Sequence, residues 1–144
     1  MHSSSVLVEE YIKGREATCA VVENFRGETL HALMPVEIVH PNSEFFDYQA
    51  KYSGESQEIC PANFDQKQKE EIQRMTAIAH KALQLRHYSR SDFIVSPRGE
   101  VYILETNTLP GLTEESLLPK ALAAGGTKFP DFLDHLVGLA MTKK

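Results

Sequence analysis

A chain of 144 residues is long enough for one domain with one hydrophobic core and too short for two domains of ordinary size. Hydrophobic residues make up 42% of it and charged residues 24%, which is typical of a folded globular protein and not of a disordered segment. The net charge is -5 and the basic residues are scattered, so neither a nucleic acid nor an acidic membrane is expected as a partner.

The cysteines and the N-terminus bear on the cellular location. Cys19 and Cys60 are the only thiols and lack CxxC spacing, so we expect reduced thiols and a cytoplasmic protein. No apolar run approaches the roughly 18 residues of a spanning helix, and the start of the chain lacks signal-peptide features. Residues 1–5, MHSSS, resemble a tag or a truncation scar. We therefore expect the domain to comprise residues 6–144 and the natural chain to extend further upstream.

The first half of the chain predicts strands followed by a helix. Residues 6–12 and 17–23 are rich in β-formers and flank Gly14, which predicts a hairpin. Residues 28–39 continue in extended style after Gly27, so the first forty residues predict an antiparallel meander. Residues 41–61 form a connection far longer than usual, which indicates a functional loop. Apolar residues then recur every three or four positions from Asp65 to about Arg86, which predicts a helix with Asp65 as N-cap.

The second half predicts a hairpin and two helices. The segment RSDFIVSPRGEVYILETN has two β-rich arms around Pro97 and Gly99. A short helix is expected near residues 114–124, stopped by Gly125 and Gly126, and an amphipathic helix from about Phe129 to Met141. Together these elements predict an α+β fold, an antiparallel sheet with flanking helices.

The predicted hairpin collects polar side chains on one face. Centring its turn between Arg98 and Gly99 places Asp92 opposite Glu105 and Arg90 opposite Asn107. Their neighbours are expected to point to the other face and supply the core, namely Phe93, Val95, Tyr102 and Leu104. Two opposed carboxylates repel unless a cation lies between them, and carboxylate and amide oxygens suit Mg²⁺. The pattern therefore favours a magnesium site, with Arg90 available for an anionic group of the substrate.

A solvated hairpin face is the alternative interpretation of the same four residues. Single charged residues on a strand usually bind nothing and contribute little to stability. An error of one residue in the position of the turn would also scatter the four side chains over both faces.

Several ordered segments resemble one family. FFDYQAKY, CPA, RSDF and ILETNTLPGLTEESLLPK are similar to the C-terminal half of D-alanine:D-alanine ligases, which are ATP-grasp enzymes. The resemblance runs from about Val6 to the C-terminus. It implies the C-terminal lobe of an ATP-grasp fold, with the N-terminal domain and the first ATP-grasp lobe absent. Members use ATP to phosphorylate one D-alanine carboxylate, and the amine of a second D-alanine attacks the acylphosphate, as part of peptidoglycan precursor synthesis.

The resemblance assigns roles to the hairpin residues and to the turn after them. Asp92, Glu105 and Asn107 match the ligands of two Mg²⁺ or Mn²⁺ ions, with Glu105 bridging them. Arg90 and the backbone N–H of Gly111 match the groups that stabilise the tetrahedral intermediate.

Further residues match substrate positions. Ser116 and Leu117 correspond to the positions that receive the carboxylate of the second D-alanine, near a helix start that Thr113 or a neighbour can cap. Lys51 and Tyr52 match the loop that closes over the phosphates and the second substrate. Within the family, a tyrosine at this position favours dipeptide over depsipeptide products.

The expected nucleotide contacts come from two segments. VEEYIKGRE matches the link between the ATP-grasp lobes, in which Glu10 and the Ile12 backbone meet the adenine and Glu16 meets the ribose. Glu10 stands where the family commonly has a lysine. The full set of expected ATP contacts is Glu9, Glu10, Ile12, Glu16 and Phe46.

Three hypotheses about function follow. The chain is the catalytic C-terminal part of a ligase for ATP and D-alanine, inactive alone because the other lobe is missing, and the full-length protein is a homodimer. Alternatively, it is a free-standing half-domain that binds nucleotide or complements a separate N-terminal partner. A related ATP-grasp carboxylate-amine ligase is the third hypothesis.

Overall fold

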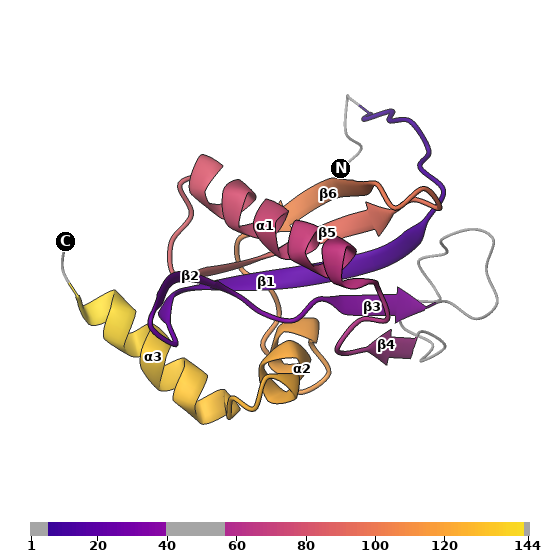
Figure 1. The fold of residues 1–144 in the computed structure, drawn as a ribbon. Helices are drawn as coiled ribbons and strands as arrows, with labels where there is room; N and C mark the ends of the chain where they lie inside the picture. Colours follow the sequence, from indigo (N-terminus) through magenta and orange to yellow (C-terminus); the bar gives the residue numbers. More distant parts are fainter. Residues whose placement is uncertain (1–5, 40–56, 143–144) are drawn as a thin grey trace.

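The computed structural model describes residues 6–39 and 57–142, which form a six-stranded antiparallel sheet and three helices (Figure 1). The strand order is β4-β3-β1-β5-β6, and β2 also pairs with β1. The elements in chain order are β1 (Arg15–Phe25), β2 (Glu28–Ala32), β3 (Val36–Val39), β4 (Gln57–Ile59), α1 (Gln66–Ala82), β5 (Tyr88–Val95), β6 (Val101–Asn107), α2 (Leu117–Ala124) and α3 (Phe129–Met141). The α+β class is confirmed.

The strand β1 is the centre of the sheet. Its 11 residues are mostly buried because helices cover both of its faces. One edge of β1 pairs with β5 over residues 15–22, and the other pairs with β3 and then β2. The predicted hairpin of residues 6–12 with 17–23 is therefore wrong, since both edges of β1 are occupied. The predicted meander is wrong in its connections as well, because β3 returns to β1 and not to β2.

Residues 6–14 form no strand, and all their apolar residues but the half-buried Ile12 are exposed, Val6 by 86% and Val8 by 87%. Gly14 does not form the turn of the predicted hairpin but lies close to β5. A Cβ there would lie 2.5 Å from the carbonyl oxygen of Val95, so only glycine lets the chain pass this close to β5. The real turn after β1 uses Arg26 and Gly27, which have φ angles of 51° and 81°.

The helix α1 covers one face of the sheet. Asp65 caps it as predicted: its side chain accepts from the backbone N of Gln68 at 2.8 Å, and the Gln68 side chain accepts from the backbone N of Asp65 at 3.1 Å. The helix ends at Ala82, a few residues before the predicted end, and Gln84 follows with a φ of 52°. The core under α1 consists of Ala17, Cys19, Ala62, Phe64, Ile72, Phe93 and Val95.

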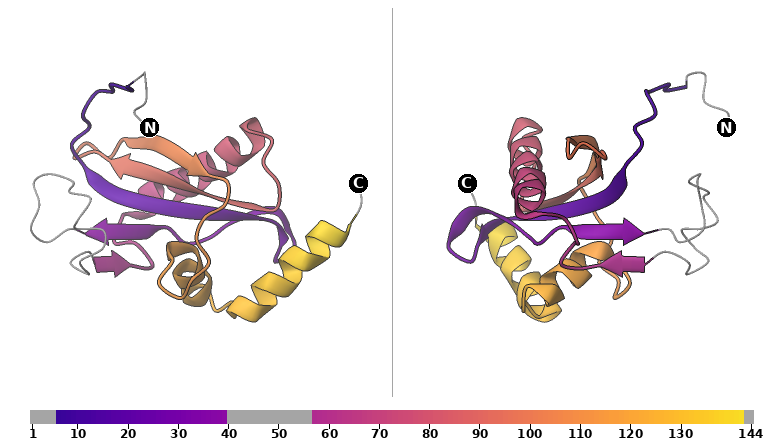
Figure 2. Two further views of the ribbon diagram at one scale, coloured as in Figure 1. Left: turned by 180° about the vertical axis from the view of Figure 1, so that it is seen from behind. Right: turned by 45° about the vertical axis from the view of Figure 1, so that its right-hand side comes forward.

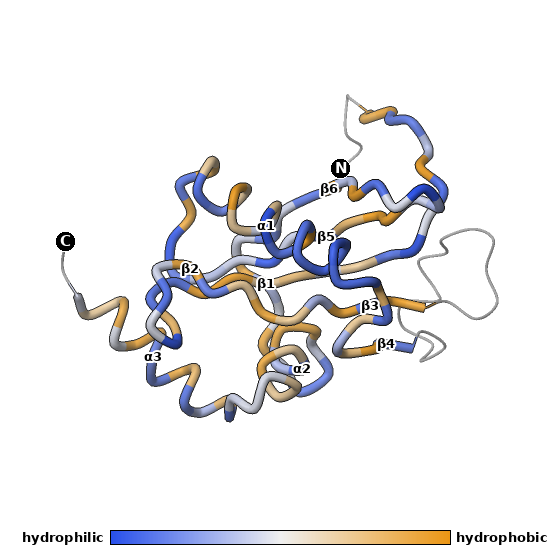
Figure 3. The backbone as a smooth tube through the Cα atoms, in the orientation of Figure 1, coloured by the Kyte–Doolittle hydropathy of each residue, from blue (hydrophilic) through white to orange (hydrophobic). Residues whose placement is uncertain are grey.

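The helices α2 and α3 cover part of the opposite face (Figure 2). They bury Leu118, Leu122 and Phe132 against Ala20 and Val22 of β1, and α2 is drawn largely in apolar colours in Figure 3.

Residues 6–39 and 57–142 include no helix with the length and apolar character needed to cross a bilayer. The polar residues of the predicted site lie on the sheet face that carries α2 and α3, further along the same strands.

Candidate active site

The hairpin of β5 and β6 pairs the predicted residues. Asp92 lies opposite Glu105, and Arg90 lies opposite Asn107. The turn is one residue tighter than predicted, because Val95 pairs with Val101. A β-bulge between Asp92 and Phe93 adds one residue to β6 and restores the predicted register at the site. The two deviations cancel, so the pairing is confirmed although the route to it differs.

The bulge changes which residues face the core. Phe93 and Val95 are buried as predicted, with 1% and 2% of their surface exposed. Tyr102 and Leu104 were predicted to join them, and that prediction is wrong, since they are 37% and 55% exposed. Tyr102 pairs with Ile94 and so shares the face of Asp92, while Leu104 is the extra residue of the bulge. Regular alternation cannot reveal a bulge, which is why sequence reasoning failed here.

Within residues 6–39 and 57–142, Asp92 accepts four hydrogen bonds from three side chains. Arg90 donates twice, from Nε to Oδ1 and from Nη2 to Oδ2, each at 2.9 Å. Asn107 Nδ2 donates to Oδ2 at 3.1 Å. Thr18 Oγ1 donates to Oδ1 at 2.7 Å. Sequence reasoning missed Thr18, because it lies in β1, 74 residues away, and only the pairing of β1 with β5 brings it opposite Asp92.

The donor set suits a hard divalent cation. Asn107 Nδ2 also donates to Glu105 Oε1 at 3.3 Å, so this one positively polarised group lies between the two carboxylates. The amide N–H of Asn107 lies where a cation would offset the repulsion between the two opposed carboxylates. The described part of the chain has no group of three or more His, Cys, Asp or Glu side chains arranged for a metal. The site instead consists of two carboxylates and one amide, and these residues fit Mg²⁺.

The chain after β6 brings Gly111 against Ser116. A Cβ on Gly111 would lie 2.7 Å from Ser116 Oγ, so a larger residue here requires the Ser116 hydroxyl to move. The Ser116 hydroxyl accepts from the backbone N of Thr113 at 3.1 Å and bonds the Thr113 hydroxyl at 2.9 Å. Ser116 is itself the N-cap residue of α2, and its side chain makes no capping hydrogen bond to that helix within the described residues. Leu117 is its first helical residue, and the N-terminal end of a helix attracts anions through its free N–H groups and its dipole.

Four of the five predicted nucleotide residues lie in the described part of the chain, in two places. Glu16 lies on β1 opposite Ile38 and Ile94, on the same sheet face as Asp92. Glu9 and Glu10 lie in the exposed segment before β1, where Ile12 is half-buried. Three predicted residues lie outside the described residues: Phe46, Lys51 and Tyr52.

Comparison with known proteins identifies the family. The family described as "D-ala D-ala ligase C-terminus" matches residues 1–138. The chain belongs to this family. The chain is 49% identical over 143 residues to the D-alanine--D-alanine ligase of Desulfotalea psychrophila. The matched region covers 98% of this chain and 44% of that relative.

Solved structures of the family agree with the fold. The VanG D-Ala:D-Ser ligase from Enterococcus faecalis has a TM-score of 0.75 and 36% identity, over 90% of this chain and 37% of that one. The D-alanine--D-alanine ligase from Bacillus anthracis complexed with ATP has a TM-score of 0.75 and 30% identity, over 92% and 40%. The chain thus spans less than half the length of the relatives that it matches.

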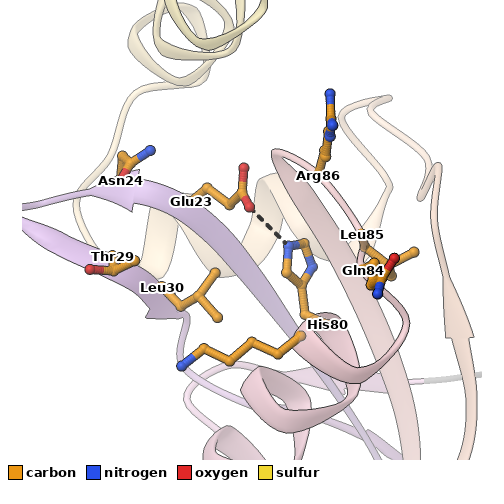
Figure 4. A pocket seen from close by; sticks show the side chains of 9 residues that line it. Glu23, Asn24, Thr29, Leu30, His80, Gln84, Leu85 and Arg86 are labelled. Atoms are coloured by element: carbon orange, nitrogen blue, oxygen red, sulfur yellow. Dashed lines mark ion pairs between the residues drawn. The ribbon is translucent and has the colours of Figure 1, made fainter. Parts of the chain in front are cut away.

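This family member also has a cavity of about 360 Å³ away from the predicted site (Figure 4). It lies between the C-terminal end of β1 and the C-terminal end of α1, on the face of the sheet that α1 covers. Glu23 Oε1 is 3.7 Å from His80 Nε2, and Glu23 Oε2 is 3.5 Å from His87 Nδ1. His80 is 1% exposed, and its Nδ1 bonds Ser89 Oγ at 2.8 Å. Burial lowers the pKa of His80, and the carboxylate of Glu23 offsets part of this effect.

Proposed function

We propose that the chain is the C-terminal catalytic lobe of an ATP-dependent D-alanine:D-alanine ligase. One observation carries the proposal, the pairing of Arg90 with Asn107 and of Asp92 with Glu105 on adjacent strands. This pairing gathers a guanidinium, two carboxylates and an amide on one face, and the turn of Gly111 and Ser116 follows β6 in the chain. Such a face suits phosphoryl transfer, in which positioning and electrostatic stabilisation do most of the catalysis.

The proposed reaction has two steps. A carboxylate oxygen of the first D-alanine attacks the γ-phosphorus of ATP, and ADP leaves. The amine of the second D-alanine then attacks the acylphosphate carbon, the amine loses a proton, and phosphate leaves with the formation of the peptide bond. Arg90 would pair with the negative charge of the phosphate and of the tetrahedral oxyanion, together with the backbone N–H of Gly111.

Asp92, Glu105 and Asn107 would hold the metal. When two Mg²⁺ or Mn²⁺ ions are bound, they neutralise the charge of the phosphate groups and of the transferring phosphoryl group. The protein's own part is to fix the oxygen ligands: adjacent strands hold Asp92 and Glu105 opposite each other, and Asn107 contacts both.

The open N-terminus of α2 supports a carboxylate site for the second D-alanine. Its unsatisfied N–H groups and the helix dipole attract an anion, and the hydroxyl of Ser116 lies at this end beside Leu117. Lys120 ties the start of α2 to its surroundings, because its Nζ donates to Glu58 at 2.7 Å and to Glu115 at 3.0 Å.

The remaining contacts extend the proposal to ATP and to the closing loop. Glu16 would meet the ribose from the site face of β1, and the segment with Glu9, Glu10 and Ile12 would run beside the adenine with Phe46. Lys51 and Tyr52 would close over the phosphates and favour a dipeptide product.

A second lobe is part of the proposal. Residues 6–144 would act with a covalent or separate N-terminal part, as a homodimer in the cytoplasm, and would be inactive alone because ATP needs groups from both lobes. A nucleotide-binding or complementing half-domain, and a related carboxylate-amine ligase, are the competing functions.

Complementation tests the proposal. The chain is expressed in a D-alanine:D-alanine ligase-deficient strain with and without the N-terminal half of a related ligase. We expect growth only when both parts are present and when Glu105 is intact. Growth with Glu105→Gln would contradict the proposed site, while growth with the chain alone would contradict its dependence on a second lobe.

A further inference from the structure

We propose that Thr18 is a positioning residue of the metal site, whose hydroxyl holds one oxygen of Asp92 so that the other oxygen faces Glu105 and Asn107. This inference rests on the proposed function. It concerns a residue of β1 that belongs to neither strand of the β5–β6 hairpin.

The contact is short, buried and charge-assisted. Thr18 lies directly opposite Asp92 in the pairing of β1 with β5 and is 1% exposed. Its Oγ1 lies 2.7 Å from Asp92 Oδ1 and 3.2 Å from the carbonyl oxygen of Ser91. One hydroxyl hydrogen serves one acceptor well, and the shorter contact to a carboxylate is the stronger. The hydroxyl of Thr18 therefore donates to Asp92.

The four hydrogen bonds to Asp92 are divided between its two oxygens. Oδ1 receives Thr18 and Nε of Arg90, whereas Oδ2 receives Nη2 of Arg90 and Nδ2 of Asn107. A carboxylate offers about four acceptor positions, so this set uses all of them. A cation that binds Asp92 must replace one of these contacts.

Burial decides which contacts exchange. The side chains of Arg90 and Asp92 are 19% and 24% exposed, and Asn107 is also partly exposed, so these groups are accessible from the open side of the sheet. Thr18 is inside the sheet and cannot move away without disturbing β1. Its bond to Oδ1 thus persists when a cation binds on the side of Oδ2. Partners that orient a metal ligand in this way typically raise metal affinity by about 10- to 100-fold.

Binding of Mn²⁺ to the 144-residue chain tests the inference, followed by electron paramagnetic resonance of the free ion. Thr18→Val keeps the β-branched shape and removes the hydroxyl, and we expect it to weaken Mn²⁺ binding about 10-fold or more. Thr18→Ser keeps the hydroxyl and should retain the wild-type affinity. Thr18→Ala removes the same hydroxyl with less bulk and replaces the valine variant if the latter does not fold.

Thr106→Val is the matched control. It removes a threonine hydroxyl from the hairpin that carries Asp92, but that hydroxyl bonds Ser91 at 2.9 Å and not Asp92. We expect wild-type Mn²⁺ affinity for it. Equal affinities of wild type and Thr18→Val would overturn the role of Thr18 alone, as would equal losses in Thr18→Val and Thr106→Val. Absence of Mn²⁺ binding by the wild-type chain would overturn the metal site itself and this inference with it.

Discussion

Replacing Glu105 by glutamine separates stability from metal binding at the proposed site. Glu105 lies opposite Asp92 with its side chain exposed, and its carboxylate accepts a hydrogen bond from Asn107 Nδ2 at 3.3 Å. The substitution keeps the size of the side chain and removes one of two opposed negative charges. Without metal, we therefore expect Glu105→Gln to be as stable as the wild type or slightly more stable.

The size of the effect follows from the strand pairing. Opposed pairs of side chains on neighbouring strands contribute about 0.2–1 kcal/mol, so relief of the repulsion gives at most about 1 kcal/mol. For a chain of this length the entropy of unfolding is about 0.3 kcal/mol per degree. The Tm in a chelator should then rise by up to about 3 °C.

Added metal should reverse the order of stability. Mn²⁺ at about ten times its dissociation constant stabilises the wild type by about 1.4 kcal/mol, or roughly 5 °C. The variant has lost a charged ligand and should show no such rise. Thermal unfolding with EDTA and with MnCl₂ measures both effects.

Glu100→Gln is the control for charge in the same hairpin. Glu100 lies beside the turn and accepts from the hydroxyl of Tyr102 at 3.1 Å, away from the paired carboxylates. It should keep the wild-type rise with Mn²⁺. A Glu105→Gln variant that responds to Mn²⁺ as the wild type does, or that is less stable by several degrees in EDTA, would refute the reasoning.

Three further changes test other parts of the structure. Gly111→Ala places a Cβ against Ser116 Oγ, and with an N-terminal half supplied it should lower phosphate release by up to about 10²-fold; wild-type rates would show that this turn is not used. Because the pKa of His80 is lowered in the folded protein, stability should fall as pH drops below the ordinary histidine value of 6.5 towards the lowered pKa. His80→Asn should reduce this loss of stability, as measured by urea unfolding at each pH. An unchanged dependence of stability on pH would exclude His80 as its source. Asp65→Ala removes the hydrogen bond that the Asp65 side chain accepts from the backbone N of Gln68, and should cost about 1 kcal/mol in the same urea assay, whereas Asp65→Ser should recover most of it.

The sequence was a good guide where a pattern was local. The spacing of apolar residues and the cap at Asp65 predicted α1 because both signals come from residues within a few positions of one another. The pairing of Asp92 with Glu105 was also predicted, although a tight turn and a bulge had to cancel for it to hold. Tyr102 and Leu104 were misplaced because the bulge lies between the turn and the site.

The pairing of strands far apart in the sequence could not be predicted from local patterns. The composition of residues 6–12 favours a strand, yet β3, β2 and β5 occupy both edges of β1 and leave it no partner. Thr18 was not predicted as a site residue for the same reason, since nothing near it in the sequence indicates that it neighbours Asp92. Local propensity says which residues can form a strand, and tertiary contacts decide where it pairs.

The bulge at Leu104 has a consequence for how this hairpin can vary. Because Leu104 has no partner on β5, its removal would leave Ile103 opposite Phe93 and Glu105 opposite Asp92. Position 104 can therefore change in size or polarity, or be lost, without shifting any of the paired residues. The hairpin keeps its paired polar side chains fixed while one adjacent exposed side chain stays free to diversify.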